Sequence, residues 1–184
     1  MTPPSTPESS GTDVVDDADG VTIVRVTERA QLERAWDVRT EVFVHEQHVP
    51  LEEEIDDLDT AESTTHVLAL DDTGGAVGTG RLLTDPAHPG EVHLGRLAVR
   101  AAARGQGIGA RLVVAIEALA LAEHAVTRDG PETGGRPRLA VRVVLSAQEV
   151  AMEFYRRLGY EVVTGERYLD AGIWHQDMAR TVVS

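Results

Sequence analysis

Apolar positions at two different spacings dominate the first part of the chain. Residues 21–26 are rich in β-branched side chains and predict a strand. Over residues 32–43 the apolar side chains recur at helical spacing, which predicts a helix spanning residues 28–46 with Thr27 as its N-cap. Pro50 is expected to end this helix, because proline cannot continue it. The pattern therefore predicts a β–α unit at the start of the fold.

The middle of the chain alternates short strand-like runs with turns. Residues 66–70, 75–83 and 92–99 are expected to form strands, because each is an apolar run bounded by turn residues. A glycine-rich segment follows at residues 104–109. Apolar side chains between residues 108 and 122 then mark the buried stripe of a second long helix.

The last part of the chain predicts another strand, a helix and a closing pair of strands. Residues 139–145 are typical of a buried strand, and Ser146 begins an S-x-x-E sequence of the capping-box type. The box is expected to open a helix that ends at Gly159, where a left-handed residue is favoured. The inner face of that helix is expected to consist of Val150, Ala151, Phe154 and Leu158. Two closing strands are expected near residues 160–168 and 173–182.

The order of these elements defines the fold class. A β–α unit, three strands and an α–β–α–β–β sequence predict one α/β (α+β) domain with a central mixed β-sheet flanked by helices. We expect this domain to occupy residues 21–184. Residues 1–20 carry five acidic residues and no basic residue, and such a polar segment cannot offset its ordering entropy by burial. It is expected to be a disordered acidic tail.

Composition excludes several classes of function. The 17 basic residues are all arginine, and 31 acidic residues give a net charge of −14. That charge argues against a nucleic-acid partner and against a polybasic membrane anchor. The absence of cysteine and lysine excludes thiolate nucleophiles, cysteine metal sites and Schiff-base chemistry, and no metal site is expected. No apolar run is long enough to span a bilayer and no signal-peptide pattern is present, so we expect a cytoplasmic protein.

The glycine-rich segment at residues 104–109 carries the most specific chemistry in the chain. Its glycines permit positive φ and a close approach of ligand to backbone, and the N–H groups of the helix start that follows favour a phosphate. Arg104 and Arg111 are expected to add charge-assisted contacts. The Walker A loop is excluded because no lysine exists, and the G-x-G-x-G spacing does not match the dinucleotide fingerprint. An ordinary glycine-rich turn is the alternative interpretation.

Two segments together resemble the GCN5-related N-acetyltransferase (GNAT) superfamily. Arg104, Gly107 and Gly109 match its [RQ]-x-x-G-x-[GA] acetyl-CoA loop, which follows a strand. One helix and one strand later, residues 148–160 resemble the family sequence N-x-x-A-x-x-F-Y-x-x-x-G-[FY]. Either motif alone is weak evidence, but the two in this order are specific. The resemblance covers about residues 21–182 and implies the acyl-CoA N-acyltransferase fold.

A branch of that family is indicated by further residues. Residues 42–47 and 170–180 look like the ElaA-like branch, as do Gly95 and Arg96 in the central strand. That branch carries Ser-Ala-Gln in place of the general asparagine motif. Gln148 therefore stands where an asparagine often contacts the cofactor arm, with the same donor and acceptor one methylene further out.

The resemblance implies acetyl-CoA as the cosubstrate, without a metal. It places the pantetheine arm along the strand that ends at Val99 and the pyrophosphate on residues 104–109. The implied cofactor-binding residues are Leu97, Ala98, Val99, Arg104, Gly105, Gln106, Gly107, Ile108, Gly109 and Gln148. The family's general acid corresponds to Tyr155, since a phenol with its ordinary pKa near 10 stays protonated at neutral pH. A core aromatic beside Phe154 is the alternative interpretation of this residue.

The residue that removes a proton from the acceptor is open between several candidates. Glu46 is the first choice, because it ends the first long helix beside the acidic segment, where the family forms its acceptor pocket. His175 is the second and His93 the third, and both are expected to lie at the acceptor site. A surface carboxylate, partly buried strand histidines, or an ordered water acting as the base are the alternatives.

The implied function is transfer of the acetyl group of acetyl-CoA to a primary amine of a small molecule. A protein N-terminal or lysine acetyltransferase is one alternative, and a non-catalytic CoA-binding sensor is another. The acidic residues of segment 52–62 suggest attraction of a cationic amine, although a solvated loop is the more common role of such a segment. Related folds often pair through edge strands, so a homodimer is an open alternative to a monomer.

Overall fold

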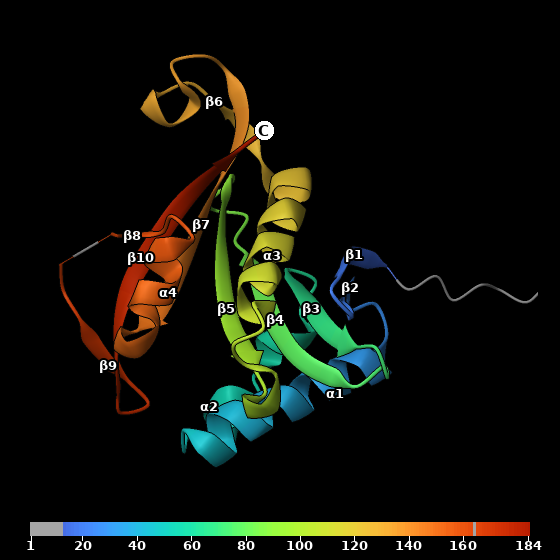
Figure 1. The fold of residues 1–184 in the computed structure, drawn as a ribbon. Coiled ribbons are helices and arrows are strands. Elements are labelled where there is room, and N and C mark those ends of the chain that lie inside the picture. Colours follow the sequence, from blue (N-terminus) through green and yellow to red (C-terminus); the bar gives the residue numbers. More distant parts are fainter. Residues whose placement is uncertain (1–12, 164) are drawn as a thin grey trace, which may run out of the picture.

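The computed structural model describes residues 13–163 and 165–184 (Figure 1). The first half of the chain forms β1 (Val14–Ala18), β2 (Val21–Arg25), α1 (Arg29–Arg39), a π-helix (Thr40–Glu46), α2 (Leu51–Glu54), a 3-10 helix (Asp57–Thr60), β3 (Thr64–Asp71), β4 (Ala76–Thr84) and β5 (Glu91–Val99). The second half forms a 3-10 turn (Ala101–Ala103), α3 (Ile108–His124), β6 (Val126–Arg128), a 3-10 turn (Pro131–Thr133), β7 (Arg138–Gln148), a 3-10 turn (Glu149–Ala151), α4 (Met152–Arg157), β8 (Glu161–Val162), β9 (Tyr168–Asp170) and β10 (Ile173–Val183).

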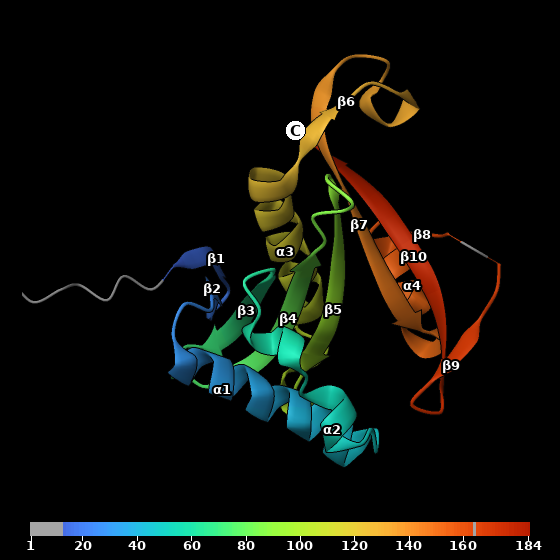
Figure 2. The ribbon, with the colours of Figure 1, turned by 180° about the vertical axis from the view of Figure 1, so that it is seen from behind.

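All of these strands belong to one mixed sheet. Its order is β1-β2-β3-β4-β5-β7-β10-β8, with β6 paired to β7 and β9 paired to β10. Helices α3 and α4 lie on the face turned toward the viewer in Figure 1, and α1 and α2 lie on the opposite face, which Figure 2 shows. The predicted fold class, a mixed sheet flanked by helices, is confirmed.

The core lies in two layers, one on each face of the sheet. Leu112 and Ile116 of α3 pack with Val67 of β3 on one face, and Val38 of α1 packs with Leu68 of β3 on the other. Successive residues of a strand point to opposite faces, so a strand covered on both sides is apolar at every position. This is why residues 67–70 of β3 form an uninterrupted apolar run.

The sheet divides where β5 meets β7. These strands are parallel, and their register covers only Glu91, Val92 and His93 opposite Arg142, Val143 and Val144. Beyond this point they separate, as Figure 1 shows below the C-terminus. The remainder of β5 therefore has a neighbour, β4, on one side only. An internal edge of this kind leaves main-chain groups available to a ligand.

The structured part of the chain begins before the predicted boundary at Val21. Val14–Ala18 forms β1, which pairs antiparallel with β2, so the tail prediction is wrong for these residues. Residues 1–12 lie outside the described residues. The polar composition of β1 hid it, because the strand lies at the sheet edge and gains its order from pairing with β2 rather than from burial.

The first long helix differs from its prediction in detail. Its N-cap is Glu28 instead of Thr27, and the side chain of Gln31 reciprocates in a capping box. The α-helical hydrogen bonding ends at Arg39, and Thr40–Glu46 continues as a π-helix. Pro50 does follow the helix, as expected, but it also caps α2. π-Helical turns are frequent at functional sites, and this one lines the cavity described below.

The predicted capping box at Ser146 does not form. The strand β7 runs on to Gln148, because its last residues pair with β10, with Gln148 opposite His175. Ladder pairing here overrides the local capping signal. The short helix α4 consequently begins later than expected and turns differently: Val150 is 89% exposed, whereas Met152 and Tyr155 are buried. Gly159 has φ +87°, which confirms its predicted left-handed conformation.

Arg111 joins β1 to the start of α3. Its Nε donates to Asp16 Oδ2 (2.6 Å), and its two Nη atoms donate to the carbonyl oxygens of Ala18 (2.8 Å) and Val21 (2.7 Å). The predicted contact of Arg111 with a phosphate is therefore wrong, since the guanidinium is fully engaged with the edge strand. The arginine instead supplies the long-range contact that secures β1.

Replacing this arginine should destabilise the fold. Arg111→Met leaves the Asp16 carboxylate and two carbonyl groups without their donor, so we expect the free energy of unfolding to fall by about 1–3 kcal/mol. Urea denaturation measures the change. Arg156→Met is the control, because Arg156 is exposed on α4 and the change should stay within about 0.5 kcal/mol. Equal midpoints for the two variants would contradict the assigned role.

Candidate active site

A cavity of about 660 Å³ occupies the space between the separated strands β5 and β7. Its walls come from the π-helix, α2, the open part of β5, the end of β7, α4 and the start of β10. The cavity brings together these predicted site residues: Glu46, Leu97, Ala98, Val99, Arg104, Gly109, Gln148, Tyr155 and His175. Residues distant in sequence thus share one site because the sheet opens there.

A β-bulge shapes the open edge of β5. Gly95 lies opposite Arg81 and Ala98 lies opposite Thr79, so β5 holds one residue more than β4 over this stretch. The bulge is centred near Arg96, whose φ of +51° is unusual for a residue with a side chain. The Arg100 N–H donates to Val77 of β4 (2.9 Å). Since main-chain groups alternate in direction along a strand, those of Val99 point away from β4, toward the cavity.

The glycine-rich loop ends in an uncapped helix start. Gly105 and Gly107 have φ of +80° and +79°, and a Cβ added to either would meet no atom within 4 Å. Gly107 is the N-cap of α3 and offers no capping side chain, so the first N–H groups of the helix have no side-chain partner there. Ile108 is buried and anchors the loop in the core. Exposed amides, the helix dipole and open space above the glycines fit a pyrophosphate group.

Arg104 links this loop to the opposite wall. Its Nη2 donates to Glu46 Oε2 at 2.7 Å, and its Nε donates to the Val99 carbonyl oxygen at 2.9 Å. The guanidinium therefore lies between the cofactor-type loop, the open strand and the π-helix. Glu46, predicted as the base, has its carboxylate in this ion pair.

Tyr155 is buried at the inner end of the cavity. Only 8% of the residue is exposed, and its ring makes edge contacts with Phe154 and Tyr160 at centroid distances of 4.9 and 5.8 Å. Burial raises the pKa of Tyr155 to about 12. The phenol is therefore protonated throughout the neutral range, as a proton donor must be. The residue packs in the core, as the alternative interpretation expects, and it also lines the cavity.

His175 enters the cavity from β10 with its ring orientation fixed. Nδ1 lies 2.9 Å from the carbonyl oxygen of Ile173, and a carbonyl can only accept, so Nδ1 carries the hydrogen. In the neutral ring Nε2 then keeps its lone pair. The ring also stacks on Tyr168 at a centroid distance of 6.1 Å. This buried histidine has the geometry of a proton acceptor.

His93 does not reach the site, so its prediction as an acceptor residue is wrong. It lies on the paired part of β5, opposite Val144, and its exposed ring lies 3.7 Å from Glu91. The reason is register: His93 belongs to the stretch where β5 and β7 are still paired, before the cavity begins.

Three predicted cofactor-binding residues of the glycine-rich loop, Gly105, Gln106 and Gly107, lie outside the cavity walls and are exposed on the surface.

Gln148 makes a contact across the opening that sequence reasoning did not foresee. Its Nε2 donates to Oε1 of Gln47, at the end of the π-helix, at 2.8 Å. The two side chains bridge the separated halves of the molecule, from β7 to the first helix. The sequence offered Gln47 only as part of the family-like segment 42–47.

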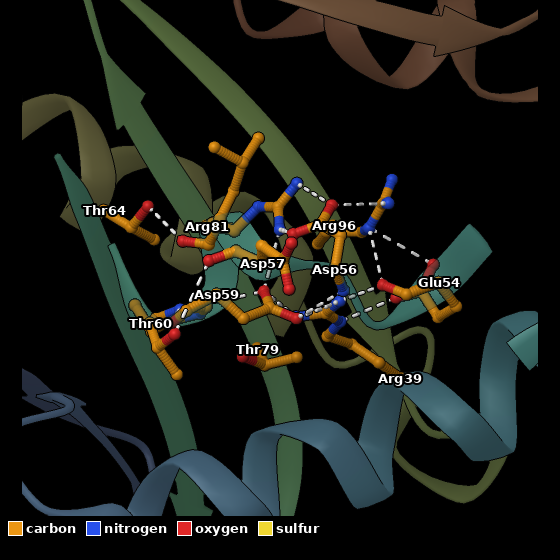
Figure 3. A network of polar contacts seen from close by, with 12 residues as sticks. Arg39, Glu54, Asp56, Asp57, Asp59, Thr60, Thr64, Thr79, Arg81 and Arg96 are labelled. Carbon is orange, nitrogen blue, oxygen red and sulfur yellow. Dashed lines mark hydrogen bonds and ion pairs between the residues drawn. The ribbon is translucent and has the colours of Figure 1, made fainter. Parts of the chain in front are cut away.

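The acidic segment 52–62 is folded rather than a solvated loop. Glu54 and Asp59 are buried, and Arg39 of α1, itself fully buried, binds both: Nε to Glu54 at 2.6 Å and Nη1 to Asp59 at 2.6 Å (Figure 3). Arg81 of β4 adds Nη1 contacts of 2.7 Å to Asp56 and Asp59. We call these residues, with Arg96, the arginine–carboxylate network. Figure 3 shows how it ties this segment to the sheet.

The network also fixes one cavity wall. Arg96, at the β5 bulge, donates from Nη2 to the Glu53 carbonyl oxygen at 2.8 Å, and its Nε lies 3.2 Å from Glu54 Oε2. Burial opposes ionisation of Asp59, but hydrogen bonds and charge from Arg39 and Arg81 outweigh it and hold the pKa of Asp59 below its ordinary value. No local sequence pattern indicates this network, because Arg39, the acidic segment and Arg81 lie far apart along the chain.

Comparison with known proteins agrees with the site geometry. The sequence pattern of the family described as "Acetyltransferase (GNAT) domain" matches residues 26–182. The chain is 36% identical over 150 residues to "Uncharacterized N-acetyltransferase YjcF" of Bacillus subtilis (strain 168), covering 82% of this chain and 92% of that protein. The protein belongs to the GNAT acetyltransferase family.

Solved structures of the same fold agree. An acyl-CoA N-acyltransferase from Pseudomonas aeruginosa superposes with a TM-score of 0.69 at 33% identity, covering 87% of this chain and 99% of that one. Escherichia coli ElaA superposes with a TM-score of 0.70 at 26% identity, with the same coverage of 87% and 99%. The predicted resemblance to the GNAT family and to ElaA is confirmed.

Two negative findings apply to residues 13–163 and 165–184. No helix in these ranges combines the length and apolar character needed to cross a membrane. No group of three or more histidine and acidic side chains in the same ranges is arranged to hold a metal ion.

Removing the central arginine of the network should cost more stability than a surface arginine. Arg39→Met removes the fully buried partner of Glu54 and Asp59 and leaves them only their contacts to Arg96 and Arg81, so we expect a loss of up to about 3–5 kcal/mol. Arg157→Met on α4 is the control, because Arg157 is exposed and its pair with Glu153 should contribute under about 0.5 kcal/mol. Chemical denaturation measures both.

The pH dependence provides a second test of the same variant. Because the pKa of Asp59 is lower in the native state than in the unfolded state, the ionised carboxylate contributes to the free energy of unfolding at neutral pH. This contribution is lost as the pH falls below about 4. Arg39→Met lacks most of this contribution, so the difference in free energy of unfolding between the wild type and the variant should narrow on acidification. A difference that stays constant or widens below pH 4 would contradict the assignment.

Proposed function

We propose that the protein transfers the acetyl group of acetyl-CoA to a primary amine of a small molecule. The observation that carries this proposal is that one cavity joins an open strand edge, the two ends of a phosphate-type loop (Arg104 and Gly109) and a buried, protonated phenol. Each of these features has an ordinary structural explanation alone. Their convergence at the opening between β5 and β7 matches the demands of thioester aminolysis.

The residues present fit acetyl-CoA. Residues 104–109 and the start of α3 would hold its pyrophosphate, and the open edge around Leu97–Val99 would pair with its pantetheine amides. Arg104 would exchange its contacts to Glu46 and Val99 for the cosubstrate. When bound, acetyl-CoA supplies the activated acyl group. A β5 main-chain N–H turned toward the cavity is a suitable donor for a developing negative oxygen.

Tyr155 is the proposed general acid. Its phenol oxygen holds a proton in the low-polarity interior beside Phe154, and it can give that proton to a leaving thiolate. The same burial keeps bulk water away from the reacting groups.

His175 is the better-placed base. Its Nδ1–H is committed to the Ile173 carbonyl, so Nε2 can take a proton from the acceptor nitrogen. Glu46, the first choice from sequence, has its carboxylate paired with Arg104. We therefore assign His175 to acid–base chemistry and Glu46 to holding Arg104.

A cationic acceptor is supported by the charge around the cavity. The carboxylates of Glu54, Asp56 and Asp59 are paired with arginines in the arginine–carboxylate network. Glu53 and Asp170 also line the cavity, and both are exposed. Their charge favours an ammonium group over an anion. The attraction predicted for segment 52–62 is thus reduced to its exposed members.

A thiol-release screen tests the function and the acid together. We expect coenzyme A release from acetyl-CoA with at least one amine from a panel of polyamines, aralkylamines and aminoglycosides.

Tyr155→Phe should lower kcat about a hundredfold or more while calorimetry finds unchanged affinity for coenzyme A. Because the pKa of Tyr155 is about 12, wild-type kcat should show no alkaline loss from this group below pH 10. Unaltered kcat in Tyr155→Phe would remove its role.

The two candidate bases separate in a parallel experiment. His175→Ala should lower kcat by about a hundredfold, and added imidazole should restore part of it by filling the vacated space. Glu46→Gln should change the affinity for coenzyme A, through Arg104, much more than it changes kcat. A large kcat loss in Glu46→Gln together with failure of imidazole rescue would reverse the assignment.

A further inference from the structure

Polar side chains are concentrated on one face of the C-terminal half of the sheet. Ser146 on β7 lies opposite Asp177 on β10, and Gln148 lies opposite His175. His175 in turn lies opposite Tyr168 on β9. Because side chains alternate along a strand, positions two residues apart share a face, and these residues form one polar surface. The intervening residues on the other face, Leu145, Ala147 and Met178, belong to the buried core.

Three of these side chains form a hydrogen-bonded chain. The Tyr168 hydroxyl donates to Asp177 Oδ1 at 2.6 Å and also bonds to Ser146 Oγ. A phenol has a single proton, and Tyr168 uses it on Asp177. Ser146 must therefore be the donor in its bond to Tyr168. The lone pairs that remain on Ser146 Oγ are available in the cavity, which Ser146 lines.

The surroundings hold this order in place. The Tyr168 ring stacks on His175 with an interplanar angle of 20°, and the interaction fixes the hydroxyl beside the two strands. Tyr168 is 39% exposed, but partial desolvation and the hydrogen bond to Asp177 still raise its pKa, which keeps the proton on the phenol. Asp177 is half-buried and thus retains access to solvent.

We propose that Ser146, Tyr168 and Asp177 form an ammonium-binding site and proton exit for the acceptor amine. The inference rests on the proposed function and specifies its substrate class: an alkylamine that is protonated at neutral pH. Ser146 Oγ accepts an N–H of the ammonium group. None of these three residues is assigned to the site by the sequence alone, from which Ser146 is expected to cap a helix.

One proton of the acceptor leaves along these hydrogen bonds. The ammonium gives a proton to Ser146 Oγ as the Ser146 proton passes to the Tyr168 oxygen and the Tyr168 proton passes to Asp177 Oδ1. Ammonium and carboxylate become neutral amine and carboxylic acid, and Asp177 then releases the proton to water. His175 takes the second nitrogen proton as the amide forms, and Tyr155 protonates the leaving sulfur. Within this group of three, Ser146 is the catalytic residue because it touches the substrate, and Tyr168 and Asp177 are positioning residues that act through it.

Paired acceptors of different basicity test the proposal. The probes, assayed at pH 8, are the best amine of the panel, which is largely protonated there, and its β,β-difluoro analogue, which is largely unprotonated there. They are phenethylamine and β,β-difluorophenethylamine for an aralkyl acceptor, or spermidine and its difluoro analogue for a polyamine. Tyr168→Phe and Asp177→Asn should each lower kcat/KM for the parent amine about a hundredfold. Coenzyme A affinity should be unchanged, and the double variant should be no worse than either single one.

The analogue separates proton removal from a structural role. With the difluoro amine the loss should shrink to about threefold or less, because no ammonium proton has to leave. Equal losses with both amines would make Tyr168 structural and overturn the proposal, and so would unaltered rates. Ser146→Ala repeats the test should Tyr168→Phe fail to fold. Glu161→Gln is the control, since this exposed carboxylate lies on β8 opposite Ala179.

The outcome distinguishes the inference from the function it rests on. If the wild type acetylates an amine while the variants keep full activity, the relay is overturned and the proposed function stands. If no amine of the panel causes the wild type to release coenzyme A from acetyl-CoA, the proposed function is overturned, and the relay is overturned with it.

Discussion

The short parallel contact between β5 and β7 is the constraint on which the site depends. Three residues of each strand pair, and then the strands separate although the sheet continues on both sides. Main-chain groups inside a protein normally find partners, and an unpaired edge invites another chain. Here the edge is enclosed by the π-helix, α4 and β10, so it is accessible to a slender ligand and protected from a second sheet. The fold therefore keeps an unsatisfied strand edge without the usual hazard of aggregation.

Charge is organised around that opening by arginine alone. A chain with a net charge of −14 and no lysine must balance its buried carboxylates with guanidinium groups. Arg39 makes separate contacts to Glu54 and Asp59, which a single ammonium point charge could not reproduce in one geometry. The consequence is mechanical as well as electrostatic: α2 and the following 3-10 helix are held against β4 and the bulge of β5. One wall of the cavity is thereby fixed to the sheet by ion pairs.

Local sequence signals predicted the fold class and the glycine-rich turn that opens α3, because both depend on short-range information. Helical spacing, β-branched runs and the glycine pattern at residues 104–109 act within a few residues of one another. The features that were missed depend on pairing across long sequence separations. β1 is ordered by β2 and Arg111, Ser146 is drawn into a strand by β10, and His93 is kept from the cavity by its register with β7. The signal that could have found Ser146 is its spacing of two residues from Gln148, because residues two apart on a strand lie on the same face. This signal applies only because β7 continues to Gln148.

The separation of β5 from β7 also divides the chemistry between two halves of the sheet. The β5 side, with the glycine-rich loop and the bulge, offers main-chain groups and arginine, which suit an anionic, amide-rich ligand. The β7–β10 side offers hydroxyl, imidazole and carboxylate groups, which suit proton transfer. Gln47 and Gln148 connect the sides by one neutral hydrogen bond, a contact weak enough to exchange for a ligand. A substrate that fills the opening would therefore satisfy both halves at once, and its binding would replace the contacts that now bridge them.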